Sequence, residues 1–199
     1  MSFGLPNISC IGYPVSLPCV GHAGLGLRVA HRGDSPDLVR HLVELDPVDR
    51  RMRFCATLGE DALACHVEDV FQRRGVVLAG FDGPIWSGPL HRPGPIRAVV
   101  ELSIAHDEAE LGISVDAGLR RRGVGTYLVQ AAGALLAPRG ARRVRAYTLS
   151  GNASFLKLAH GLGGRIESGA DEVEVIFDVA DLHRRYLRRR AAQLFVAAA

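Results

Sequence analysis

The residues with the clearest chemical meaning lie in segment 111–128, which reads LGISVDAGLRRRGVGTYL. A predicted strand runs here into a turn rich in arginine and glycine, and a predicted helix begins directly after the turn. Backbone N–H groups in the first turn of a helix have no intrahelical partner, and the helix dipole adds partial positive charge there. Gly123 and Gly125 carry no side chain that would block a ligand. The segment therefore predicts a binding site for phosphate groups.

Two other glycine-rich phosphate motifs do not fit this segment. A dinucleotide-binding fingerprint would require a third glycine at position 128, which is Leu128. A P-loop would require Gly-Lys-Ser or Gly-Lys-Thr, and neither tripeptide is present.

A known family has the same glycine spacing. Arg120-x-x-Gly123-x-Gly125, placed after a strand that ends at Val115, resembles the Q/R-x-x-G-x-G/A pyrophosphate loop of the GNAT superfamily of N-acetyltransferases. A second match follows, where that superfamily has N-x-x-A-x-x-L-Y-x-x-x-G-F and this chain has Asn152, Phe155, Leu158 and Gly163. The resemblance implies an α/β fold with a mixed, mostly antiparallel central sheet flanked by helices. It also implies acetyl-CoA as co-substrate, an amine as acceptor, and no metal.

One departure from the motif points to a branch of the superfamily. The usual tyrosine, which often protonates the leaving thiolate, is replaced by Ala159. An alanine there is similar to bacterial protein lysine acetyltransferases, whose A-E-x-x-x-x-V strand resembles residues 109–115 and whose S-R-x-x-R-F helix resembles residues 49–54. Ser154, His160 or solvent could protonate the thiolate instead.

The resemblance implies the roles of individual residues. Glu110, the glutamate of the A-E strand, is expected to be the general base, with Glu101 on the neighbouring strand as the second choice. Asn152 is expected either to bind near the pantetheine or only to cap its helix. The predicted coenzyme-binding residues are Ile113, Ser114, Val115, Arg120, Arg121, Arg122, Gly123, Val124, Gly125, Thr126, Asn152 and Phe155.

The acceptor stays open between a protein lysine, which the branch favours, and a small amine. A catalytically silent acyl-CoA-binding module is the alternative, because the usual tyrosine is missing. The arginines of residues 183–190 could instead attract nucleic acid, but a solvated terminal helix explains them as well, so a nucleic-acid partner is not expected. The resemblance leaves a homodimer open.

The elements that must position these residues follow from hydrophobic periodicity and from turn and cap signals. Helices are predicted to begin at Pro36 and Pro47 and to cover 60–72, 123–137 and 152–162. Strands are predicted at 27–30, 75–81, 96–104, 109–115, 143–149 and 172–179. We divide the chain into an irregular segment (1–25), the acetyltransferase domain (26–180) and a basic C-terminal helix or tail (181–199).

Composition places the chain among ordinary globular proteins. It has 199 residues, 48% of them hydrophobic, and a formal net charge of +3. No uninterrupted apolar run of about 18 residues occurs, so we expect no membrane span and a cytoplasmic protein. Four cysteines without a C-x-x-C pair indicate neither a zinc site nor a disulfide framework.

Overall fold

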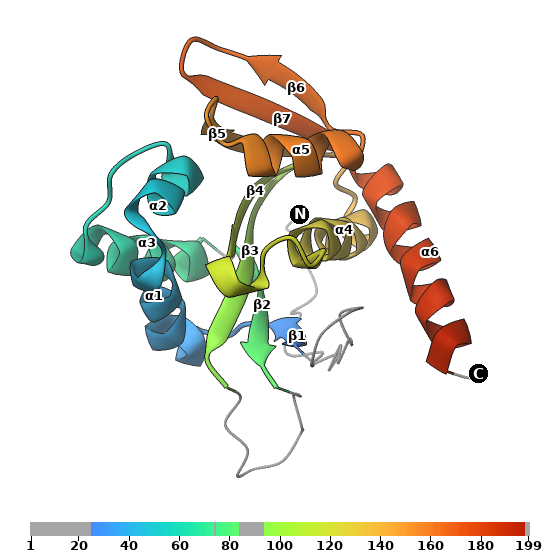
Figure 1. Ribbon diagram of the computed structural model, residues 1–199, viewed down its shortest axis with the longest axis horizontal. Helices are drawn as coiled ribbons and strands as arrows, with labels where there is room; N and C mark the ends of the chain where they lie inside the picture. Colours follow the sequence, from blue (N-terminus) through green and yellow to red (C-terminus); the bar gives the residue numbers. More distant parts are fainter. Residues whose placement is uncertain (1–24, 74, 84–93, 198–199) are drawn as a thin grey trace, which may run out of the picture.

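The structure, a computed structural model, describes residues 25–73, 75–83 and 94–197, with side chains as far as residue 192. The described strands form one seven-stranded sheet with helices on both faces (Figure 1). The elements are β1 (Leu25–Val29), η1 (Arg32–Asp34), α1 (Ser35–Glu44), α2 (Pro47–Phe54), α3 (Glu60–Gln72), β2 (Val76–Asp82), β3 (Ile96–Ala105), β4 (Glu108–Val115), η2 (Ala117–Leu119), α4 (Val124–Leu136), η3 (Ala137–Arg139), β5 (Arg143–Leu149), α5 (Ala153–Gly161), β6 (Arg165–Ser168), β7 (Glu172–Asp178) and α6 (Val179–Ala197).

The sheet has the order β1-β2-β3-β4-β5-β7-β6. All neighbouring strands are antiparallel except β4 and β5, which are parallel. This arrangement confirms the predicted fold class. No helix in the described part of the chain combines the length and the apolar character that crossing a bilayer requires.

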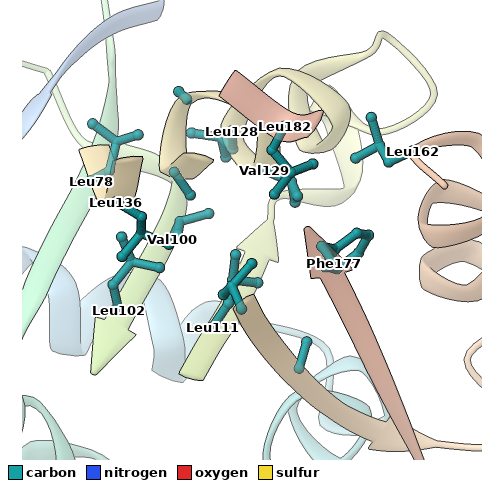
Figure 2. Packing of buried hydrophobic residues seen from close by; sticks show 14 of the residues in the cluster. Leu78, Val100, Leu102, Leu111, Leu128, Val129, Leu136, Leu162, Phe177 and Leu182 are labelled. Carbon is teal, nitrogen blue, oxygen red and sulfur yellow. The ribbon is translucent and has the colours of Figure 1, made fainter. Parts of the chain in front are cut away.

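Two hydrophobic clusters cover the two faces of the sheet, because successive side chains of a strand point to opposite sides. On β3, Val99 joins the cluster formed with α1 and α3, whereas Val100 joins the cluster formed with α4, α5 and α6. Figure 2 shows the second cluster, which includes Leu128 of α4, Leu182 of α6 and Val100 of β3. The candidate site residues are therefore carried by a sheet that is fixed from both sides.

Helix α6 packs antiparallel along α4. Gly133 of α4 permits this close approach, since a Cβ built on Gly133 would lie 2.4 Å from the Leu182 Cβ. Leu182 is fully buried, and Tyr186 packs against the same cluster. The basic residues 183–190 thus lie on a helix that is docked onto α4.

Most predicted elements are present, with ends shifted by a few residues. The prediction missed β6, a four-residue edge strand that is exposed along its whole length. Such a strand has no buried face and so produces no hydrophobic alternation in the sequence. Of the segment predicted to be irregular, residues 1–24 lie outside the described residues.

The packing of α6 can be tested by truncating Leu182. We expect Leu182→Ala to lower the free energy of unfolding by about 2–5 kcal/mol, because it leaves a cavity against Gly133. Leu187 on the same helix is 53% exposed, and Leu187→Ala should change the free energy by less than about 0.5 kcal/mol. Urea denaturation measures both, and equal effects would contradict the docking of α6.

Candidate active site

The candidate site begins where β4 and β5 separate. The two strands pair in parallel only between Glu108–Glu110 and Arg143–Arg145, whereas β4 continues to pair with β3 as far as Val115. Beyond Glu110 the other edge of β4 therefore has no neighbour among the described strands. A cleft of about 1100 Å³ opens there between β4, β5, α2 and the first turns of α4 and α5.

The cleft brings together almost all the predicted coenzyme-binding residues. Its walls include every one of them except Arg122, which is exposed. They also include Ser154, which was predicted as a possible proton donor to the thiolate. Further wall residues, for which no site role was predicted, come from the end of α1, from α2, from β5 and from α5; among them are Leu45, Asp49, Met52, Arg53, Tyr147, Thr148, Lys157 and Leu158.

The loop before α4 has the backbone shape that its glycines suggested. Gly123 has φ = 78°, and Arg121 has φ = 60°, a left-handed conformation that is uncommon for residues other than glycine. The loop turns the chain so that the first N–H groups of α4, from Val124 to Thr126, lie at the cleft without an intrahelical partner. A Cβ on Gly125 would lie 2.9 Å from Leu158 Cδ1, so any larger residue would narrow the cleft.

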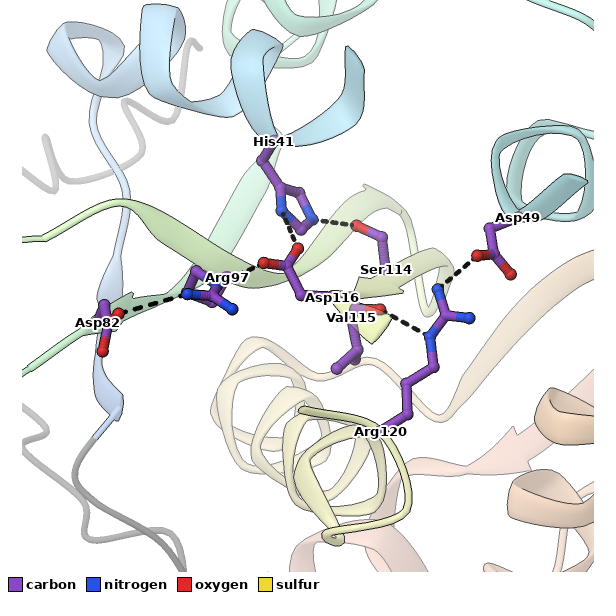
Figure 3. A network of polar contacts seen from close by, with 8 residues as sticks. All are labelled: His41, Asp49, Asp82, Arg97, Ser114, Val115, Asp116 and Arg120. Carbon is purple, nitrogen blue, oxygen red and sulfur yellow. Dashed lines mark hydrogen bonds and ion pairs between the residues drawn. The ribbon is translucent and has the colours of Figure 1, made fainter. Parts of the chain in front are cut away.

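The three predicted phosphate-binding arginines are used differently. The Arg120 guanidinium turns back along the loop, donating from Nε to the Val115 carbonyl at 3.0 Å and from Nη2 to Asp49 Oδ2 at 2.7 Å (Figure 3). It thereby joins α2 to the end of β4. Arg121 lines the cleft with an exposed side chain, and Arg122 does not line it. Arg121 is thus the one of the three that is placed to meet a ligand.

A buried polar network fixes the end of β4. His41 of α1 lies with Nε2 2.8 Å from the Ser114 hydroxyl and Nδ1 3.1 Å from Asp116 Oδ1 (Figure 3). Arg97 contacts Asp116 as well as Asp82. Burial alone would raise the pKa of Asp116, but the hydrogen bonds from His41 and Arg97 bring it below its usual value. The hydrogen bond between His41 Nε2 and the Ser114 hydroxyl gives that hydroxyl a buried partner beside the cleft.

Sequence reasoning missed this network. His41 and Ser114 are 73 residues apart, and His41 lies on a helical face with Leu38 and Leu42, where it resembles a core position. No local signal relates it to the cleft.

Asn152 acts as a helix cap in this structure. Its Oδ1 accepts from the Phe155 backbone N–H at 3.2 Å, and its Nδ2 donates to Thr148 Oγ1 at 2.9 Å. Thr148 in turn donates to the Met52 carbonyl of α2 at 2.9 Å. Of the two predicted roles, capping is therefore what the contacts show, and Asn152 also ties α5 to β5 and α2 at the cleft wall.

Glu101 is fully engaged by neighbouring cations. It is 7% exposed, and its Oε2 lies 2.6 Å from Arg53 Nη2 and 2.8 Å from His66 Nε2. Burial raises its pKa, but the charge of Arg53 and the hydrogen bond from His66 outweigh burial, so the pKa of Glu101 lies below the ordinary value. The Arg53 side chain reaches Glu101 by crossing Gly112, where any Cβ would collide with the guanidinium. Glu101 itself does not line the cleft.

Glu110 has the opposite environment. It is exposed and makes no hydrogen bond or ion pair with another described residue. In the sheet it lies opposite Ser103 of β3 and Arg145 of β5, on the same face as Glu101. The pKa of Tyr147 is raised mainly by burial of its phenol and by its hydrogen bond to Glu174. The negative charge of Glu110 adds a smaller effect in the same direction. Glu110 is not one of the wall residues of the cleft either, but it directly precedes Leu111, which lines the cleft, and its charge acts on Tyr147, which also lines it.

Comparison with known proteins identifies this arrangement. Residues 62–163 match the family model described as "Acetyltransferase (GNAT) family". The chain belongs to the GNAT family of acetyltransferases. The match spans the strands that diverge, the loop before α4 and helix α5. It confirms the predicted class, an N-acetyltransferase that uses acetyl-CoA as co-substrate.

Solved structures share the fold. The GNAT domain of S. lividans PAT is 23% identical, with a TM-score of 0.67 over 84% of this chain and 96% of that chain. Spermidine N-acetyltransferase from Vibrio cholerae, solved with CoA and spermine, is 15% identical, with a TM-score of 0.62 over 79% of this chain and 97% of that one. The putative acetyltransferase yncA from Salmonella typhimurium, solved with acetyl-CoA, is 14% identical, with a TM-score of 0.56 over 78% and 94%. No curated protein matches the chain.

Two kinds of unpaired backbone group line the cleft of this GNAT protein. The open edge of β4 has peptide groups without a strand partner among the described strands, and the N-terminus of α4 has free N–H groups and partial positive charge, which favour anions. Across the described ranges, no group of three or more His, Cys, Asp or Glu side chains could bind a metal ion.

The ion pairs of Glu101 predict a pH-dependent contribution to stability. The pKa of Glu101 is lower in the folded state than in the unfolded state. The ion pairs therefore contribute fully to the free energy of unfolding above the unfolded-state pKa of about 4.3, and this contribution disappears as the pH falls through the folded-state pKa. Glu101→Gln should therefore cost on the order of 2 kcal/mol at pH 7 and progressively less below pH 4.3. Denaturation of both proteins from pH 3 to pH 7 measures the difference, and a constant difference would contradict the assignment.

Proposed function

We propose that this protein transfers acetyl from acetyl-CoA to a primary amine by direct attack, with Glu110 as the general base. The observation that carries the proposal is the contrast between the two candidate carboxylates. Glu101 is ion-paired with its pKa lowered, which makes it a weak base. Glu110 is exposed, without an ion pair among the described residues, and next to the cleft wall.

The described residues suggest how acetyl-CoA would be bound. We expect the backbone of Ile113–Val115 to pair with the pantetheine arm and to place the thioester at the point where β4 and β5 separate. The N–H groups of Val124 to Thr126 would bind the pyrophosphate, with Arg121 beside it. Arg120 would contribute indirectly, by holding the loop against β4 and α2.

The reaction requires a neutral amine. A lysine amine with a pKa of about 10.4 is uncharged in roughly one molecule in 2,500 at pH 7, so a base beside the cleft has a clear role. Glu110 would accept one proton from the ammonium group, the neutral amine nitrogen would bond to the acetyl carbon, and the carbon–sulfur bond would break to release the thiolate. The nitrogen would then lose a second proton, and the thiolate would take up a proton in its place. Ser154 lines the cleft and could protonate that thiolate, whereas Ala159 is buried and has no acidic group.

The surroundings of Glu110 favour a cationic acceptor. Tyr147 in the cleft wall is 43% exposed and donates a hydrogen bond to Glu174. Glu174 and Glu108 share Arg145 between them, and Glu108 also pairs with Arg143. Together with Glu110, these groups are three carboxylates and two guanidinium groups. We favour a protein lysine over a small amine, in line with the resemblance of residues 109–115 to the lysine acetyltransferase branch.

The homodimer, the cytoplasmic location and the domain boundaries stay predictions.

Coenzyme binding can be tested at Gly125. Acetyl-CoA at 100 times its Kd should raise the melting temperature by on the order of 5 °C, and Gly125→Glu should abolish that shift. A glutamate there fills the space near Leu158 and places a negative charge where the pyrophosphate would bind. Gly59→Glu is the matched control, since nothing lies within 4 Å of a Cβ at Gly59. A wild-type protein without any shift would rule out the proposed cleft.

The role of Glu110 can be tested by Glu110→Gln. We expect kcat to fall about 100-fold or more, because general base catalysis contributes that much, while the acetyl-CoA Kd stays unchanged. Thiol release with lysine peptides and polyamines as acceptors measures the rate and identifies the acceptor class.

Two outcomes of that assay contradict the proposal. A Glu110→Gln enzyme with wild-type kcat would remove Glu110 as the base. A wild-type protein that binds acetyl-CoA but acetylates no amine would favour the silent acyl-CoA-binding module.

A further inference from the structure

Two arginines of α6 contact wall residues of the coenzyme cleft, although neither Arg185 nor Arg189 is itself one of the wall residues. Helix α6 runs antiparallel to α4, so its later residues approach the first turn of α4. The Tyr186 and Tyr127 rings are 5.9 Å apart, and one turn further along, the Arg189 guanidinium lies 5.4 Å from the Tyr127 ring centre. A Cβ built on Gly123 would be 3.3 Å from Arg189 Nη2. Since Gly123 lines the cleft, Arg189 lies directly behind the phosphate-binding loop.

Arg185 reaches the same end of the cleft from the side of α5. Its Nη1 donates to the Gly161 carbonyl at 3.4 Å, and Gly161 also lines the cleft. Arg185 and Arg189 are four residues apart, so they project from the same face of α6. This face spans the gap between the end of α5 and the start of α4.

Neither guanidinium is neutralised by a carboxylate in the part of the chain that the structure describes. Arg184, in contrast, is paired with Asp181 one turn before it. Lys157 and Arg121 add two further exposed cations to the cleft walls. Asp49, the acidic residue of the walls, is already bonded to Arg120. This end of the cleft therefore has an excess of positive charge that the protein itself does not compensate.

We propose that Arg185 and Arg189 bind the 3′-phosphate of coenzyme A. The inference rests on the proposed coenzyme cleft and adds to it a site on a helix outside the glycine-rich loop. With the thioester at β4 and the pyrophosphate at the start of α4, the adenosine 3′-phosphate is the next anionic group along the coenzyme. Guanidinium groups bind phosphate through paired N–H donors. The stacking of Arg189 on Tyr127 and the bond of Arg185 to Gly161 would orient both groups before the ligand arrives.

Comparison of coenzyme A with 3′-dephospho-coenzyme A tests the proposal. We expect the wild-type protein to bind coenzyme A about tenfold more tightly, and we expect Arg185→Ala combined with Arg189→Ala to remove that preference. The variant should bind both ligands with the wild-type Kd for the dephospho form. Isothermal titration calorimetry measures the four constants, and melting curves without ligand confirm that the variant is folded.

Arg188→Ala is the matched control. Arg188 is an exposed arginine of the same helix and makes no hydrogen bond or ion pair within the described ranges. This variant should keep the tenfold preference. The preference should also shrink as ionic strength rises, because the contacts are charged and partly exposed.

Three results would overturn the proposal. A wild-type protein that binds both ligands equally has no 3′-phosphate site. A double variant whose affinity for coenzyme A and for 3′-dephospho-coenzyme A falls by the same factor shows a general structural effect. If the double variant weakens binding of a DNA or RNA oligonucleotide but leaves the coenzyme preference intact, the arginines serve nucleic acid instead. A wild-type protein that binds neither coenzyme form would contradict the proposed function itself, which separates that failure from the other three.

Discussion

The separation of β4 from β5 is the constraint on which the rest of the structure depends. Strands inside a sheet normally satisfy their backbone groups with two neighbours, and unpaired groups away from water are costly. Here β5 pairs with β7 over its whole length, and β4 pairs with β3 over its whole length. The pairing between β4 and β5, in contrast, ends at Glu110. The open edge needs water or a ligand as its partner. A thioester with an amide-bearing arm supplies the hydrogen-bonding groups that the missing strand would have provided.

Contacts between distant elements keep the cleft open. The Arg120 guanidinium joins the loop before α4 to α2, and Thr148 joins β5 to α2 through the Met52 carbonyl. His41 anchors the end of β4 from α1. These bonds approach the cleft from three sides, so the α1 and α2 face supports the site as well as covering the sheet. The same face contains Glu101, whose carboxylate is used in the ion pair with Arg53, whereas the side chain of Glu110 has no such partner among the described residues.

Helix α6 combines packing and charge. Its inner face, with Leu182 and Tyr186, fills the groove along α4 that Gly133 opens. Its arginine-rich surface is thereby fixed at the end of the cleft rather than left in solution. A segment that looks like a solvated basic tail in the sequence is thus placed by apolar packing where its charge can act on a phosphate.

The sequence by itself indicated the family and most of the elements and predicted a backbone phosphate site, because these depend on local signals: hydrophobic period, capping residues and glycines at fixed spacing. The exposed strand β6 has no such signal and was missed. The sequence also named both carboxylates. Only the tertiary structure decided that Arg53 and His66 occupy Glu101 while Glu110 stays exposed, since those partners lie 48 and 35 residues away from Glu101. The same holds for His41 beside Ser114 and for Arg189 beside Gly123. Contacts between residues far apart in the chain depend on helix docking and strand order, which no local pattern encodes.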